Sequence, residues 1–126
     1  MANPRQIVGF KELHVQRATF ITDSSITFKR DEPYGTDAHL APVKVTGEGE
    51  VGLCADGDVP FGALERVEAD GMAVVAYHGF VEFAGEAEYG SAVVADGSGG
   101  VRAVDTEAGR GTAIHAPSDG TVIVFI

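Results

Sequence analysis

The sequence GLCADGDVPFGALERVEADGMAVVAYHGFVEFAGEAEYG, residues 52–90, decides the fold. Asp-Gly pairs at 56–57 and 70–71, together with Gly79, divide it into short apolar runs. An Asp-Gly pair supplies the positive φ angles that tight hairpin turns require, so such a pair between apolar runs indicates a turn between two strands. The stretch therefore predicts β-structure with short connections.

The same pattern continues towards the C-terminus. Asp-Gly recurs at 96–97 and 119–120, and the segments 80–83 (FVEF) and 101–104 (VRAV) alternate between two side-chain faces. Alternation is typical of half-buried strands, whereas the nearly continuous apolar run at 72–78 is typical of a strand covered on both faces. The predicted strands occupy residues 51–55, 61–67, 72–78, 80–84, 91–95, 101–104, 111–115 and 121–126.

About eight short strands separated by turns predict an all-β fold, a small barrel or sandwich. The segment 61–69 (FGALERVEA) allows one short helix. A chain of 126 residues has the length of one domain and buries roughly two thirds of its unfolded surface, so it needs no disulfide or metal to fold. The single cysteine, Cys54, lies in an apolar run and is predicted to be a buried, inert thiol.

Charge divides the chain into two parts. The net charge of −10 argues against a nucleic-acid partner. Residues 1–45 hold six basic and five acidic residues, whereas residues 46–126 hold three basic and fourteen acidic residues and fifteen of the seventeen glycines. We therefore divide the chain into an N-terminal arm or hairpin with a proline-bracketed loop, residues 1–42, and a β-barrel body, residues 43–126.

The N-terminal part is either the first hairpin of the barrel or an extended arm, and its different charge balance favours the arm. Segments 12–23 and 25–29 are β-prone, and a loop follows between Pro33 and Pro42. An extended chain can pair with the exposed sheet edge of a partner, gaining main-chain hydrogen bonds.

Side chains that would serve catalysis or metal binding are few and scattered. The four histidines have no metal-ligand spacing, and the Asp-Gly-Asp at 56–58 lacks the acid that a calcium loop needs at its twelfth position, where Val67 stands. Glu82, Glu86 and Glu88 are predicted to form the outward face of an edge strand rather than a pair of catalytic carboxylates. We therefore predict no enzyme activity, no metal and no cofactor.

Nucleophilic catalysis has no sequence motif either. Gly-x-Ser-x-Gly is absent, and Ser24, Ser25, Asp37 and His39 would have to be brought together by the fold. The N-terminus has no signal-peptide pattern, and no apolar run approaches the ~20 residues that span a bilayer. These features predict a soluble protein that is made in a cytoplasm and has no membrane partner.

The order of features over roughly residues 46–126 resembles the head decoration (capsid cement) proteins of tailed bacteriophages, the lambda-type β-tulip proteins. The matching features are FGAL at 61–64, the apolar strand at 72–77, Gly79 opening GFVEF, the strand led by Gly90, GTAI at 111–114 and a terminal apolar strand ending at Ile126. The resemblance implies a β-tulip, β-clip-like barrel with an extended N-terminal arm.

The resemblance also implies a function. Decoration proteins of this kind bind the major capsid protein as homotrimers over three-fold and quasi-three-fold axes, on the outer surface of the mature virion. They stabilise the shell and catalyse no reaction. The arm would contact capsid subunits, and we expect its apolar residues to anchor an added edge strand: Ile7, Val8, Phe10, Leu13 and Val15.

Other small β-proteins need residues that can be looked for in this sequence. A trimeric dUTPase-like enzyme would need a GxIDxxYxG motif, but Tyr77 and Tyr89 lack the neighbouring aspartate. A biotinyl or lipoyl carrier would need a lysine at a hairpin tip, and residues 46–126 contain none. A carbohydrate-binding β-module, which usually relies on exposed aromatic side chains, and a phage tail or fibre module remain as alternatives.

Overall fold

The protein is all-β. The computed structural model describes residues 15–126, which form nine strands and no helix. The strands are β1 (Val15–Thr22), β2 (Pro42–Gly47), β3 (Glu50–Leu53), β4 (Gly62–Val67), β5 (Met72–Ala84), β6 (Val93–Ala95), β7 (Val101–Ala103), β8 (Thr112–His115) and β9 (Thr121–Phe125). The short helix that the sequence allowed over residues 61–69 does not form, because most of that segment is β4.

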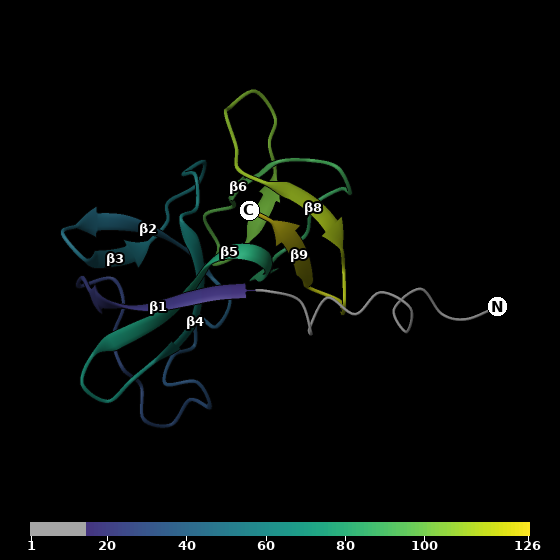
Figure 1. The fold of residues 1–126 in the computed structure, drawn as a ribbon. Helices are drawn as coiled ribbons and strands as arrows, with labels where there is room; N and C mark the ends of the chain where they lie inside the picture. Colours follow the sequence, from purple (N-terminus) through teal and green to yellow (C-terminus); the bar gives the residue numbers. More distant parts are fainter. Residues whose placement is uncertain (1–14) are drawn as a thin grey trace.

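Five strands close into a barrel in the order β1-β3-β2-β4-β5, and pairing between β1 and β5 completes the ring. The β1–β5 ladder is antiparallel and runs from Val15 opposite Gly79 to Ile21 opposite Met72. Figure 1 shows β1 alongside β5 across the middle of the molecule, with the β2–β3 hairpin at one end and β6, β8 and β9 at the other. The small-barrel prediction is thus confirmed.

The long strand β5 belongs to both halves of the molecule. Its first part pairs with β1 and β4, and its second part, from Phe80 to Ala84, pairs with β9. The change of partner occurs at Gly79, whose φ of 100° favours glycine and whose backbone exchanges two hydrogen bonds with Ile126. The two strands predicted on either side of Gly79 are therefore one strand.

Two hydrophobic cores stabilise the fold. One fills the closed barrel and comprises Ile26, Val43, Val51, Leu64, Val67, Ala73 and Val75. The other comprises Ala63, Ala76, Val81, Phe83, Val93, Val101, Ala113, Val122 and Val124. The second core includes side chains of the two-stranded sheet β6–β7, so that sheet is held to β5, β8 and β9 by apolar packing as well as by hydrogen bonds.

The Asp-Gly turns form as predicted. The glycines of all four pairs have φ between 81° and 86°. The pair at 70–71 connects β4 to β5, and the pair at 119–120 connects β8 to β9; both are hairpins. The pair at 96–97 begins the β6–β7 connection, whereas the pair at 56–57 lies between β3 and β4, which are not paired with each other.

The N-terminal part differs from the expected arm. Residues 15–22, which we assigned to the arm, are β1 of the closed barrel, and the loop after β1 buries Ile26 in the barrel core. The backbone N–H of Val67 on β4 donates to the carbonyl of Tyr34 in the same loop. The physical reason is that β1 gives β5 a hydrogen-bonding partner and packs Phe20 against the barrel core. Residues 15–22 thus belong to the barrel's own sheet, which is one of the two alternatives that the sequence left open.

Candidate interaction surface

The reactive residues singled out in the sequence do not converge. The Ser25 hydroxyl bonds the carboxylate of Asp23, and Asp37 pairs with Lys29 at 2.7 Å. The His39 Nδ1 lies 2.8 Å from the carbonyl oxygen of Glu65. Within residues 15–126 no group of three His, Cys, Asp or Glu side chains is arranged to hold a metal ion.

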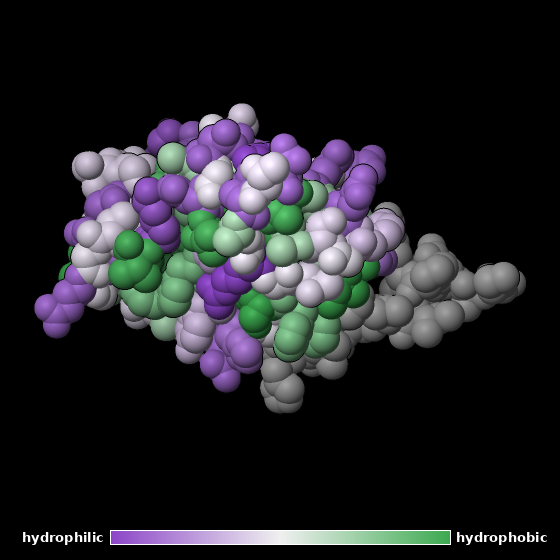
Figure 2. Space-filling view, turned by 90° about the horizontal axis from the view of Figure 1, so that it is seen from above, coloured by the Kyte–Doolittle hydropathy of each residue, from purple (hydrophilic) through white to green (hydrophobic). Residues whose placement is uncertain are grey.

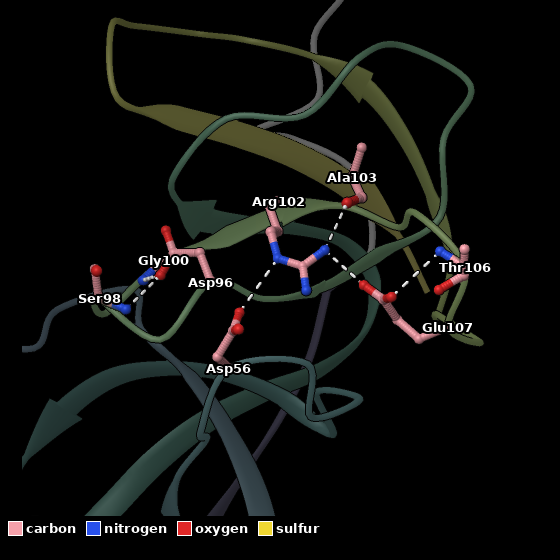
Figure 3. A network of polar contacts seen from close by, with 8 residues as sticks. All are labelled: Asp56, Asp96, Ser98, Gly100, Arg102, Ala103, Thr106 and Glu107. Atoms are coloured by element: carbon pink, nitrogen blue, oxygen red, sulfur yellow. Dashed lines mark hydrogen bonds and ion pairs between the residues drawn. The ribbon is translucent and has the colours of Figure 1, made fainter.

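The carboxylates of the 56–58 turn are paired with cations. Asp58 accepts from Lys44 at 2.6 Å and from the backbone N–H of Ala55. Asp56 pairs with Arg102, which also bonds Glu107 at 2.5 Å (Figure 3). The Lys44 ammonium holds the pKa of the Asp58 carboxyl below its ordinary value. These contacts fix the turn to β2 and β7 and give it a structural role.

Cys54 is half-buried between β3 and the 56–58 turn. Burial, and then the charge of Asp58, raise the pKa of its thiol to about 11. Because the thiolate is the reactive form of cysteine, a raised pKa makes the side chain a poor nucleophile.

Thiol labelling checks this property of Cys54. At pH 8 a thiol with a pKa of about 11 is on the order of 0.1% thiolate. Alkylation of the folded protein by iodoacetamide should therefore be on the order of 10²-fold slower than alkylation in denaturant. Equal rates in the folded and unfolded chains would contradict the assignment of Cys54 as an inert thiol.

The three glutamates near the end of β5 do not form one cluster. Glu82 lines one hollow, whereas Glu86 and Glu88 line another. The second hollow, of about 320 Å³, also contains Asp119 and the 70% exposed side chain of Tyr89. Glu82 lies on β5, whereas Glu86 and Glu88 follow the end of that strand, so the three glutamates do not share one strand face.

A hollow that the sequence did not reveal lies outside the barrel, across β1, β4 and β5. It has a volume of about 250 Å³ and is lined by Val15, Arg17, His39, Leu40, Glu65, Phe80, Glu82 and Ile123. An adjoining hollow shares Arg17, His39 and Glu65 with it and adds Tyr34, whose ring stacks on His39 at 3.6 Å between centroids. These residues are too far apart in sequence for any spacing to have indicated the site.

Large apolar side chains are exposed at scattered places. They are Ile21, Phe28, Tyr34, Val45, Val59, Tyr89 and Phe125. Figure 2 shows one face of the molecule, on which several small hydrophobic areas interrupt the hydrophilic surface. Phe125 of β9 lies 5.0 Å from Phe80 and 6.3 Å from His78, measured between ring centroids, so these rings form one aromatic patch beside the hollow lined by Phe80.

The predicted capsid-binding residues are only partly within the described chain. Val15 is the first residue of β1, is half-buried, and packs against the core that contains Phe83. It is therefore part of the protein's own sheet, not of a free arm. Ile7, Val8, Phe10 and Leu13 lie outside the described residues.

One edge of β1 is largely open. One edge of β1 pairs with β5 from Val15 to Ile21, whereas the opposite edge pairs with β3 only at Ile21 and Thr22. Over residues 15–20 that edge pairs with no other strand in the described part of the chain. An open strand edge can accept an added strand from a partner.

Comparison with known proteins leaves the family open. No family model matches the chain, and no curated protein matches it in sequence. Residues 15–126 include no apolar helix of membrane-spanning length. The fold and its surface therefore define the class: an all-β protein built on a closed five-stranded barrel.

Proposed function

We propose that this protein is a capsid decoration protein of a tailed bacteriophage. It binds the major capsid protein on the outside of the mature head, as a trimer at three-fold and quasi-three-fold sites, and stabilises the shell. The observation that carries the proposal is a compact barrel whose first strand has an open edge over residues 15–20. The feature order shared with β-tulip decoration proteins supports the same conclusion.

The charge distribution is consistent with this role. Residues 46–126 hold fourteen acidic and three basic residues, so free copies repel one another and stay dispersed. Arg17 and Lys44 are already paired with Glu65 and Asp58 inside the protein. Arg5 and Lys11, which precede β1 in the sequence, supply two further cations for attachment.

Attachment by three copies gains from avidity. A trimer that presents three N-terminal segments to one lattice binds on the order of 10²–10⁴ more tightly than a single segment, without any new contact. A strand added at an open sheet edge also ties neighbouring capsid subunits through main-chain hydrogen bonds, which must break before the shell opens. We therefore assign the contact with the capsid to residues 1–14 and to the open edge of β1.

Head binding after truncation tests the proposal. Deleting residues 2–14 spares β1, so the variant should fold but should sediment with purified expanded heads at least about tenfold more weakly than the full chain. Incubation with purified tails in parallel distinguishes decoration from a tail role. Head binding that is unchanged by the deletion would refute the N-terminal attachment, and binding of the full chain to tails alone would refute the decoration role.

A further inference from the structure

The hollow across β1, β4 and β5 has the composition of a site for one side chain. Its apolar lining is Val15, Leu40, Phe80 and Ile123, and its polar lining is Arg17, His39, Glu65 and Glu82. A volume of about 250 Å³ is large enough for one long side chain but small for a drug-sized ligand. The apolar lining suits the aliphatic part of a long side chain. The polar lining determines whether the charged end of that side chain is a cation or an anion.

Among the polar side chains that line the hollow, that of Glu82 is the one with no hydrogen bond or ion pair to the described residues 15–126. Arg17 pairs with Glu65 at 2.5 Å, so their charges offset each other. The Nδ1 of His39 lies 2.8 Å from the Glu65 carbonyl oxygen, which can only accept, so Nδ1 carries the proton. The backbone of Glu82 pairs with Ile123 in the β5–β9 ladder, but its half-buried carboxylate has no hydrogen bond or ion pair with any residue from 15 to 126.

The wall of the hollow is held in a fixed shape. Leu40 has a φ of 67°, the one positive value of a non-glycine residue among residues 15–126. Its N–H donates to the Leu64 carbonyl at 2.6 Å, and its carbonyl accepts from the N–H of Ala84 at 2.9 Å. A non-glycine backbone in this sparsely populated region is strained and persists only where the surroundings impose it. The loop is thus fastened to β4 and β5, and the hollow is preformed.

We propose that this hollow receives a lysine or arginine side chain of a partner protein. The aliphatic stem lies against the apolar lining, and the cation pairs with the Glu82 carboxylate. The argument is charge complementarity: a half-buried carboxylate without a cation stands over an apolar floor. The identification of the major capsid protein as the partner that supplies this side chain rests on the proposed function. The specificity of the hollow for a basic side chain does not.

A small probe tests the hollow without any capsid. N-acetyl-lysine N-methylamide, added at millimolar concentrations to the ¹⁵N-labelled full chain, should shift the amide signals of Leu40, Glu82 and Ile123. The neutral N-acetyl-norleucine N-methylamide should shift them much less, and Glu82→Gln should abolish the lysine-specific shifts. Equal shifts from both probes, or none from either, would overturn the proposal. Lysine-specific shifts that appear only after Lys11→Gln would assign the hollow to the chain's own N-terminal segment and would also overturn it.

Binding to capsids then tests whether the major capsid protein supplies the basic side chain. Glu82→Gln should weaken sedimentation with expanded heads by at least about tenfold, because a partly desolvated charge pair is lost. Glu88→Gln makes the same change in net charge at an exposed side chain outside the hollow and should bind as the wild type does. If the wild type binds heads and Glu82→Gln binds equally well, the capsid does not supply the basic side chain. If the wild type does not bind heads, the proposed function fails, whatever the probe shows.

Discussion

A chain that lacks residues 2–22 should be unfolded, whereas a chain that lacks residues 2–14 should retain the barrel. The longer deletion removes β1, and with it the ladder to β5 that closes the ring. It also removes Phe20 from the barrel core and Val15 from the second core. Both side chains are half-buried, so losing their burial costs at most about 1.5–3 kcal/mol each. Together with the lost strand pairing, this approaches the roughly 5–15 kcal/mol that holds a domain folded.

Far-ultraviolet circular dichroism and the dispersion of amide proton signals measure the outcome. The shorter deletion is the matched control, since it leaves every strand intact. Phe20→Ala is an intermediate case: it keeps the β1 ladder but leaves a space beside the Phe61 ring, 5.5 Å away between centroids, and should cost about 3 kcal/mol. A dispersed, cooperative fold in the chain that lacks residues 2–22 would show that β1 is not needed to close the barrel.

Replacing Arg110 by methionine should destabilise the protein by about 3 kcal/mol. The Arg110 guanidinium donates to the carbonyls of Pro60, Phe61 and Tyr77, and its carbon lies 5.9 Å from the centre of the Phe61 ring. Burial lowers the pKa of this guanidinium. Methionine has similar length but no donor, so three carbonyls lose this donor, and the segment before β8 loses its side-chain tie to β5 and to the segment before β4.

Urea denaturation measures this loss as a shift of the midpoint at unchanged slope. Arg66→Met is the matched control, because Arg66 is exposed on β4 and its one ion pair among residues 15–126 is with the partly exposed Glu68. Exposed ion pairs of this kind contribute about 0–1 kcal/mol, so the control should change stability little. Equal midpoints for the two variants would show that the contacts of Arg110 with the three carbonyls contribute nothing beyond those of a surface arginine.

The turns and most of the body strands followed from local sequence. In each Asp-Gly pair the glycine adopts a positive φ, a preference that depends only on the pair itself. The turns at 70–71 and 119–120 therefore need no distant partner to form. Alternation likewise specified the second part of β5 and β7, whereas β4 and β9 followed from apolar runs between turns. Gly79 was misinterpreted as a break, because a glycine between two apolar runs gives the same pattern whether the chain turns or one strand changes partner.

The sequence by itself determined the class of fold and the positions of the turns, since both depend on residues within a few positions of one another. Tertiary structure alone decided that Val15–Thr22 is a barrel strand, because an alternating segment pairs equally well with its own sheet or with a partner's. It also decided the hollow around Glu82 and the carbonyl contacts of Arg110. Arg110 and Tyr77 lie 33 positions apart, and Val15 and Ile123, at two sides of the hollow's lining, lie 108 positions apart. Over such separations the sequence pattern carries no information about contact.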